Sequence, residues 1–150
     1  MRRFVVALAA VVVGASTVLL VHAVDGDATT RPDDTLGPGV VTVHVGVEHS
    51  DFSVTHVKVR TGTTVRFVLE NHDPINHELV VGGAAVHARH RRGSEASHPP
   101  VPGEVSVGPN ATGVTFHRFN RVGDFEFACH LPAHYEYGMR GTVEVIGDRS

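Results

Sequence analysis

The chain has 150 residues, with 13 Lys or Arg against 16 Asp or Glu and a formal net charge of −3. This length suits one domain with a short extension, and the small acidic excess argues against nucleic-acid binding, which usually brings a basic excess. Histidine is abundant, at 12 residues, whereas cysteine occurs once.

The N-terminal segment has the composition of an export signal. Two arginines precede an apolar run from residue 4 to about residue 24, and a pattern of two small residues around His22 offers a cleavage site after Ala23. An uncleaved membrane anchor is the alternative, because the run is close to the ~20 residues that span a bilayer. We assign residues 1–23 to a signal peptide or anchor. Both interpretations place the rest of the chain outside the cytoplasm, as a secreted, periplasmic or membrane-anchored protein.

A polar segment separates this extension from the rest of the chain. Residues 24–39 are rich in Asp, Thr, Gly and Pro, which is typical of a flexible linker. From Val40 onwards, valine alternates with other residues, and this period of two is the signature of β-strands. We therefore expect residues 40–147 to form a single β-rich domain.

Eight segments of this domain have the alternation and the β-branched composition of short strands. They are Val40–Glu48, Phe52–Arg60, Thr64–Asn71, His77–Val81, Glu104–Gly108, Gly113–Phe119, Gly123–Cys129 and Gly141–Gly147. Only residues 84–103 interrupt the pattern, as a loop that could include a short helix. Seven or eight such strands predict an all-β fold, an antiparallel sandwich or barrel.

The sequence EFACHLPAHYEYGMRG, residues 126–141, brings three potential metal ligands into one loop. Cys129 ends a strand on the same face as two phenylalanines, which should be the core side. His134 follows five residues later and Met139 five after that, with a proline and a glycine between them to turn the chain. Thiolate, imidazole and thioether together favour copper. The spacing therefore predicts a copper site between two adjacent strands.

A fourth ligand should come from another loop, because a blue-copper centre has two histidines, one cysteine and a weak axial methionine. The segment ENHDPINHELVV, residues 70–81, contains His72 and His77. We prefer His77, because it begins a strand whose side chains can face the same end of the core. His72 is the alternative ligand, and its simpler interpretation is a residue of a solvated turn.

With these residues the chain resembles the cupredoxins, the type 1 or blue copper proteins. The ligand loop of that family reads roughly F-x-C-x-x-P-G-H-x-x-x-G-M-x-G, and here it is FACHLPAHYEYGMRG, with Ala133 where glycine is common. We expect the alanine to be tolerated unless the position requires a positive φ. The resemblance covers about residues 40–147 and implies a Greek-key β-sandwich. It also implies that one type 1 copper ion is bound by His77, Cys129, His134 and Met139.

Other histidines near the motif leave several interpretations open. His130 adjoins the cysteine as in the trinuclear copper motif of multicopper oxidases, but Ala128 replaces the histidine on the other side. A solvated loop position and a role in electron exit are its other interpretations. His87, His90 and His98 could form a second, labile copper or zinc site. Neighbouring arginines would repel cations, so a solvated loop is the simpler interpretation.

Four protein ligands leave no open coordination position for a substrate, so we do not expect an enzyme. The sequence favours a one-electron carrier outside the cytoplasm, with a transient redox protein partner that docks beside His134. Copper handling or copper tolerance is the alternative, favoured by the histidine-rich loop and weakened by the lack of a Met-rich segment. A non-redox β-sandwich with a vestigial site is the third hypothesis, and the complete ligand set argues against it.

Overall fold

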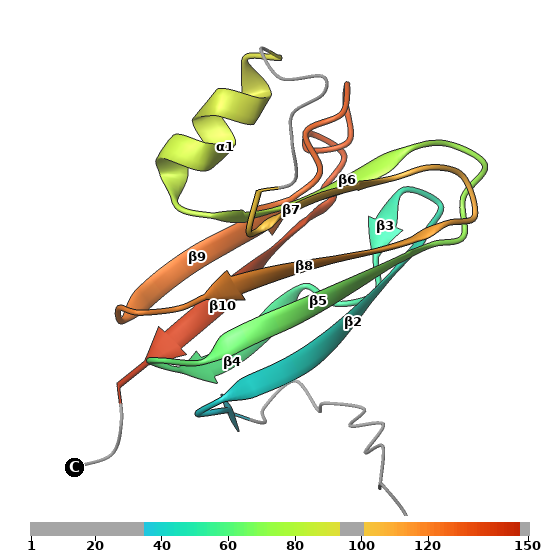
Figure 1. Cartoon of the computed structure of the whole chain (residues 1–150). Coiled ribbons are helices and arrows are strands. Elements are labelled where there is room, and N and C mark those ends of the chain that lie inside the picture. The colour runs from blue at the N-terminus through green and yellow to red at the C-terminus, as the bar shows by residue number, and fades with distance from the viewer. Residues whose placement is uncertain (1–34, 94–100, 148–150) are drawn as a thin grey trace, which may run out of the picture.

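A computed structural model describes residues 35–93 and 101–147 of the chain (Figure 1). The predicted signal peptide or anchor, most of the predicted linker and His98 lie outside these ranges. The described residues form ten β-strands and one α-helix. This helix is not long and apolar enough to cross a membrane. The elements are β1 (Thr35–Leu36), β2 (Val40–Glu48), β3 (Asp51–Phe52), β4 (His56–Arg60), β5 (Thr64–Asn71), β6 (His77–Gly82), α1 (Ala84–Arg91), β7 (Glu104–Val107), β8 (Thr112–Arg118), β9 (Gly123–Ala128) and β10 (Arg140–Ile146).

Seven of the eight predicted strands are present as single strands, with ends within one residue of the prediction. The prediction of one strand from Phe52 to Arg60 is wrong. Phe52 pairs with β2 in one sheet, whereas His56 begins the pairing with β10 in the other. The chain crosses between the sheets at this point, so the strand is broken into β3 and β4. The short strand β1 lies within the segment that we predicted to be a linker.

The strands form two sheets, which confirms the all-β fold class. One sheet has the order β1-β4-β10-β9-β6-β7 and the other the order β3-β2-β5-β8. The expectation of a purely antiparallel arrangement is wrong, because β1–β4, β4–β10 and β2–β5 are parallel pairs. Each parallel pair needs a connection that crosses between the sheets. Buried and exposed residues alternate in the same way in parallel and in antiparallel strands. The sequence pattern could therefore not reveal which strands pair in parallel.

The core lies between the two sheets and is built from the residues that alternate inward along each strand. In β2, Val43, Val45 and Val47 are buried in turn. Phe127 on β9 lies at the centre, with its ring 5.8 Å from that of Phe52. Burying one such side chain stabilises a fold by roughly 1.5–3 kcal/mol. This core holds β6, β9 and β10 rigidly in place, and these strands flank the predicted ligand loops.

Helix α1 covers part of the six-stranded sheet and packs against β6 and β9 (Figure 1). The face of α1 toward the sheet is polar rather than apolar. His87 and His90 on that face are only 1% and 7% exposed. The expectation that these two histidines lie in a solvated loop is therefore wrong. Their burial is made possible by carboxylates on the sheet, because His90 Nε2 lies 3.0 Å from Glu104 Oε2.

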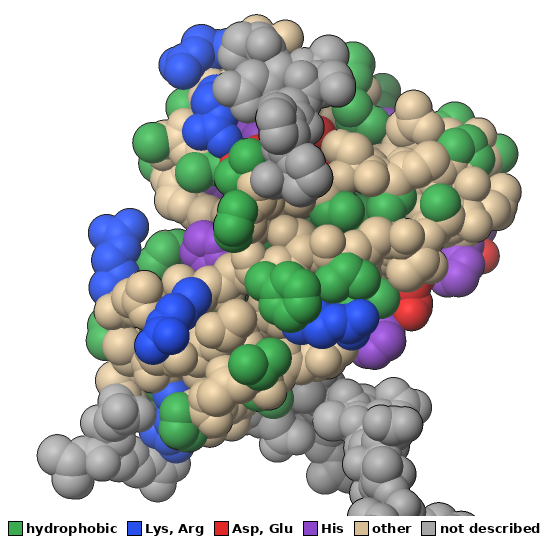
Figure 2. Space-filling model, viewed as in Figure 1, with side chains coloured by type: hydrophobic (Ala, Val, Ile, Leu, Met, Phe, Trp, Pro, Cys, Tyr) green, Lys and Arg blue, Asp and Glu red, His purple; other side chains and the backbone are tan. Residues whose placement is uncertain are grey.

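Strand β8 forms an edge of the four-stranded sheet and has apolar residues on its outer face. Val114 and Phe116 are 39% and 47% exposed. Thr115 between them is buried, and its hydroxyl accepts a hydrogen bond of 2.9 Å from the Gly103 amide. Figure 2 shows hydrophobic side chains on the face where β8 lies, next to Lys or Arg and His side chains. This face is separate from the end of the sandwich that carries the predicted copper ligands.

Candidate metal centre

The pairing of β6 with β9 brings the first predicted ligand to the cysteine. The two strands are antiparallel, with Val80 opposite Ala128. The residues before Val80 therefore run beside the residues that follow Ala128. His77 begins β6 and Cys129 follows directly after β9, so both lie at the same end of the sandwich. The side chains of His77 and Cys129 are both fully buried.

The loop from β9 to β10 folds back on itself and places the other two predicted ligands. The carbonyl of Met139 accepts a hydrogen bond of 3.0 Å from the Cys129 amide, and the amide of Met139 donates one of 3.0 Å to the His134 carbonyl. Met139 is therefore joined through its backbone to both other ligand residues of the loop. Its side chain is buried, as expected for an axial thioether at the edge of the core.

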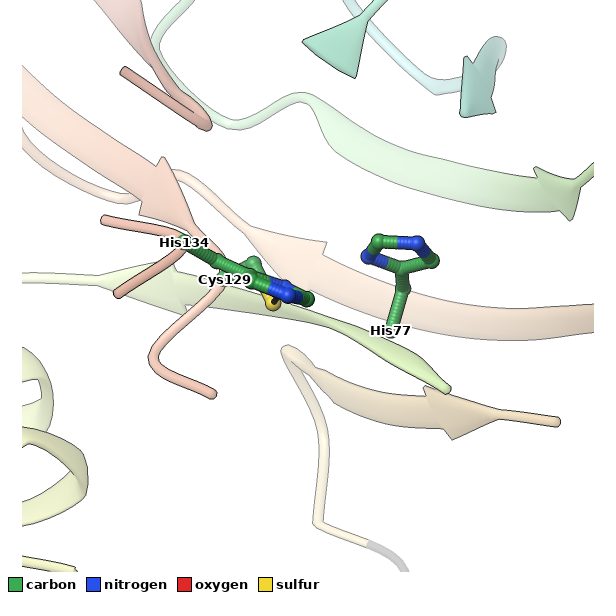
Figure 3. A group of neighbouring side chains, drawn as sticks. All are labelled: His77, Cys129 and His134. Carbon is green, nitrogen blue, oxygen red and sulfur yellow. Dashed lines mark hydrogen bonds between the residues drawn. The ribbon is translucent and has the colours of Figure 1, made fainter. Parts of the chain in front are cut away.

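Three of the four predicted ligands present their donor atoms to one point (Figure 3). One donor atom from each of His77, Cys129 and His134 lies within 4.8 Å of the other two. Cys129 Sγ and His134 Nδ1 are in contact at 3.2 Å. Figure 3 shows the Cys129 and His134 side chains together, with the His77 ring opposite them. His72 is exposed and is not a member of this group, so the structure places His77 rather than His72 at the site.

Asp73 fixes the orientation and the hydrogen position of the His77 ring. His77 Nε2 lies 2.9 Å from Asp73 Oδ2. Burial would raise the pKa of this carboxyl, but the backbone amides of Ser50 and His49, together with His77, hold it below its usual value. The ionised carboxylate can only accept, so Nε2 carries a hydrogen and Nδ1 is the nitrogen left to face a metal ion. Among the described residues, this buried Nδ1 has no hydrogen-bond partner.

The cysteine is protonated in the absence of a metal ion. Burial raises the pKa of the Cys129 thiol to about 11, although backbone hydrogen bonds from Glu78 and Leu131 lower it in part. Burial, and next the neighbouring His77, hold the pKa of His134 below its usual value. At neutral pH the thiol therefore carries its proton beside a neutral imidazole. A cation would displace that proton and would be bound by the resulting thiolate.

These donors fit the metal that the sequence predicts. Two imidazole nitrogens, one thiolate sulfur and a nearby thioether form the His₂Cys set with an axial Met that is typical of blue copper. The unpartnered Nδ1 of His77 is the strongest single sign, because a buried polar atom normally has a hydrogen-bond partner. A copper ion bound among these donors would accept the electron pair of this nitrogen.

Ala133 adopts a backbone conformation that suits glycine. Its φ is +71°, in the left-handed region, where a Cβ atom costs roughly 1–2 kcal/mol. The amide of Tyr137 donates to the Ala133 carbonyl, at 3.0 Å, and Pro132 precedes it in the same turn. The backbone at Ala133, where the cupredoxin loop pattern has glycine, is therefore strained. We expected the alanine to be tolerated unless the position required a positive φ, and the structure shows that it does.

Replacing this alanine with glycine should stabilise the protein. We expect Ala133→Gly to raise the free energy of unfolding by about 1 kcal/mol, because glycine adopts a positive φ without strain; its greater freedom in the unfolded chain offsets part of the gain. Urea unfolding of the copper-free protein would measure this. Gly138→Ala is the matched reverse change, since Gly138 has a φ of +103° in the same loop and should lose stability. Equal stability of Ala133→Gly and the wild type would show that the turn relaxes.

Asn71, Asp73 and Glu78 support the site, and our sequence analysis did not single them out. Asn71 and Asp73 organise the loop that precedes His77. Glu78 accepts a hydrogen bond of 2.8 Å from the backbone amide of His130, next to the cysteine. The only sequence signal was the presence of polar residues inside or directly beside apolar strands. Such residues are buried only if they have partners, and here their partners are loop backbone groups.

His130 is not an outward-facing loop residue. Its Nε2 lies 2.8 Å from His87 Nδ1, and its ring stacks on that of Tyr135 with 5.1 Å between centroids. Burial, followed by the nearby His87 and His90, lowers the pKa of His130 to about 4. The interpretation of His130 as solvent-facing is therefore wrong. The histidines of α1 and the one beside the cysteine form a second group next to the predicted copper ligands.

The fold and the donor set together define a cupredoxin, a copper protein of the type 1 class. A family model described as copper binding proteins of the plastocyanin/azurin family matches residues 40–146. The chain belongs to this family, and its cofactor is copper. The match also coincides with the domain that the alternating valines predict.

Curated relatives extend the comparison. The copper-resistant cuproprotein CopI of Rubrivivax gelatinosus is 38% identical over 128 residues, which cover 83% of this chain and 78% of that protein. The copper-resistant cuproprotein CopI of Pseudomonas aeruginosa is 29% identical over 126 residues, which cover 63% of this chain and 70% of that protein.

Solved structures share the fold. The dithionite-reduced auracyanin of Roseiflexus castenholzii has a TM-score of 0.58 at 23% identity, over 72% of this chain and 99% of that chain. Auracyanin A of Chloroflexus aurantiacus, a blue copper protein, has a TM-score of 0.57 at 23% identity, over 72% of this chain and all of that chain. At this level of identity the likeness extends to the fold alone.

Proposed function

We propose that the chain binds one copper ion through His77 Nδ1, Cys129 Sγ, His134 Nδ1 and the thioether of Met139. The observation that carries this proposal is the convergence of three donor atoms within 4.8 Å, one of them the thiol of Cys129. Bound there, copper would supply a one-electron Cu(II)/Cu(I) couple. Asp73 orients the His77 ring, and the hydrogen bonds of Met139 hold the loop closed.

The role of this site is the handling of excess copper outside the cytoplasm. Two relatives named copper-resistant cuproproteins support this function, the first of them 38% identical to this chain. Electron transfer, which the sequence alone favoured, has weaker support. The auracyanin structures share the fold at 23% identity, and a shared fold at this identity does not indicate a shared function. A site with four protein ligands has no open position for a substrate, so we also propose that the chain is not an enzyme.

Deletion of the gene in its source organism tests this function. We expect the deletion strain to stop growing at a copper concentration several-fold lower than the parent strain, and a plasmid copy to restore growth. Zinc stress is the control and should affect both strains equally, because the thiolate and thioether donors favour copper. If the deletion strain tolerates copper normally but has impaired respiration, electron transfer replaces copper handling as the function.

A further inference from the structure

Strand β8 leaves a long edge of the four-stranded sheet without a partner strand (Figure 1). In the part of the chain that the structure describes, the other strands at the edges of the two sheets are short. Strands β1 and β3 have two residues each and β7 has four, whereas β8 has seven. Folded proteins usually keep exposed edges short or charged, because unpaired backbone groups can pair with another chain. The length of β8 therefore singles it out as a place where a strand can be added.

The backbone groups of β8 point alternately toward β5 and toward the open edge. The Phe119 amide donates a hydrogen bond of 2.9 Å to the Thr63 carbonyl, and the Ala111 carbonyl accepts one of 2.9 Å from the Asn71 amide. These bonds flank β8 at its two ends, so its odd-numbered residues face β5 and its even-numbered residues face away. Among the described elements, no strand pairs with the amides and carbonyls of the even-numbered residues, which are Thr112, Val114, Phe116 and Arg118.

The side chains of these four residues lie on the outer face of the sheet, and all are exposed. Arg118 is the only Lys, Arg, Asp or Glu in the strand, so the middle of the edge is uncharged. Strand β7 does not cover the edge. A Cβ atom on Gly113 would lie 2.6 Å from the side chains of Val105 and Val107, which shows that β7 packs on the inner face of β8. The edge is therefore open, with an apolar centre.

A second copy of the chain fits this edge. Strand β8 spans Thr112–Arg118, so two antiparallel β8 strands overlap over their whole length when a two-fold axis passes between them at Thr115. In that register, Val114 of each copy lies opposite the partner's Phe116, and Thr112 lies opposite the partner's Arg118. The same contacts are made twice, as an interface between two identical copies requires.

The charges near the two ends of β8 are complementary in this arrangement. Glu70 on β5 is the neighbour of Thr112, whereas Arg118 lies at the other end of β8. The ends of a strand of seven residues are about 20 Å apart, so these two charges do not meet within one chain. In the antiparallel pair, the partner's Arg118 lies two strand spacings from Glu70, about 10 Å, which two long side chains can bridge.

Both side chains have contacts within their own chain that leave this ion pair possible. Glu70 Oε1 lies 2.9 Å from His44 Nδ1, and both of these side chains are partly exposed. Arg118 donates to Asn120 through Nε, at 2.8 Å. A guanidinium group has four further N–H donors. An ion pair between the two copies therefore requires neither contact to break.

We propose that two copies of the chain associate through antiparallel pairing of β8, which joins their four-stranded sheets into one continuous sheet. Each outward-facing residue then exchanges backbone hydrogen bonds with the residue opposite it. Val114 and the partner's Phe116 form an apolar cross-strand pair of the kind that stabilises sheets. The pairing uses none of the four predicted copper ligands, so it goes beyond the proposed function and does not depend on it.

Sedimentation velocity of the full-length, copper-loaded protein over a range of concentrations tests this pairing. We expect the wild type to be in equilibrium between monomer and dimer. Val114→Lys should raise the dissociation constant of the dimer about tenfold or more, because it removes two apolar cross-strand pairs per dimer and charges the edge. Val122→Lys is the matched control, since Val122 is 65% exposed but lies outside β8, and it should dimerise as the wild type does. All these proteins carry the same N-terminal segment, so a difference between them comes from the substitution.

A charge exchange tests the antiparallel register. Arg118→Glu should raise the dissociation constant about threefold to tenfold, because it brings two carboxylates together at each end of the pair. Glu70→Arg in the same chain should restore dimerisation. Arg118 is exposed at the end of β8, so Arg118→Glu should fold even if Val114→Lys does not. An unchanged blue band and circular dichroism spectrum would show that each variant keeps its copper site and fold.

Hydrogen exchange of the Cu(I)-loaded protein, followed by NMR, locates the contact. Exchange of the Val114 and Phe116 amides should slow as the concentration rises, whereas that of the Thr115 amide, which faces β5, should not change. The proposal is wrong if the chain stays monomeric at every concentration, or if Val114→Lys and Val122→Lys weaken the dimer equally. If the wild type is monomeric and binds vesicles of anionic lipid that Val114→Lys does not bind, this face contacts a membrane instead.

Discussion

Replacing Cys129 with serine should abolish the intense visible absorption of the copper-loaded protein. That absorption requires a thiolate bound to Cu(II), and a serine hydroxyl does not ionise at neutral pH. Copper affinity should fall by more than the roughly 10- to 100-fold that loss of an outer partner of a ligand costs. Serine is close to cysteine in size, and the backbone contact between Cys129 and Met139 does not involve the side chain. The fold should therefore survive, which circular dichroism can check.

The same variant should alter the proton release that accompanies copper binding. Since burial raises the pKa of the Cys129 thiol to about 11, the thiol is protonated before copper binds. Binding to the wild type should release about one proton per ion. Protons compete with copper for the sulfur, so copper affinity should rise about tenfold per pH unit from about pH 7 to about pH 9. The serine variant should show neither effect.

Calorimetric titration in buffers of different ionisation enthalpy would count the protons. A serine variant that remains blue, or that releases as many protons as the wild type, would show that Cys129 is not a copper ligand. Met139→Leu is a useful comparison, because it removes a weak axial donor without removing an ionisable group. That variant should stay blue, release its proton as the wild type does and have a changed redox potential.

The strands and the ligand loop could be predicted because their signals are local. In β2, valine at every second position reports which face is buried, and the structure places those valines in the core. In the loop after β9, Cys129, His134 and Met139 are separated by few residues, so a turn suffices to bring them together. His77 could be preferred to His72 as the fourth ligand because the sequence pattern shows that a strand begins at His77.

The remaining features depend on contacts between distant residues. Parallel pairing of β2 with β5 leaves no mark on the alternation of either strand. Helix α1 has a polar sequence that is typical of a solvated segment, yet His87 is buried because the carbonyl of Glu126 and the ring of His130 accept and donate hydrogen bonds there. The sequence alone could not show whether Ala133 has a positive φ, because φ depends on how the turn closes. The strain at this residue could therefore not be predicted.

Replacing Asn71 with alanine should be among the most destabilising single changes near the site. Asn71 is only 2% exposed. Its Nδ2 donates hydrogen bonds of 2.7 Å to the carbonyls of Ile75 and Gly108, and its Oδ1 accepts one of 2.9 Å from the amide of Asp73. Alanine leaves two carbonyls and one amide without these partners. At roughly 1–3 kcal/mol for each unsatisfied buried group, we expect a loss of about 3–5 kcal/mol, since water can reach part of the loop.

Urea unfolding of the copper-free protein would measure the effect, and copper titration would measure its consequence. Asn120→Ala is the control, because Asn120 is exposed and, within the part of the chain that the structure describes, its side chain accepts one hydrogen bond, from Arg118. It should change stability by less than about 0.5 kcal/mol. Because Asn71 holds the loop that positions Asp73, copper affinity should also fall in Asn71→Ala and stay unchanged in the control. A loss below about 1 kcal/mol in Asn71→Ala would mean that water replaces the amide fully. The orientation of His77 would then depend on Asp73 alone.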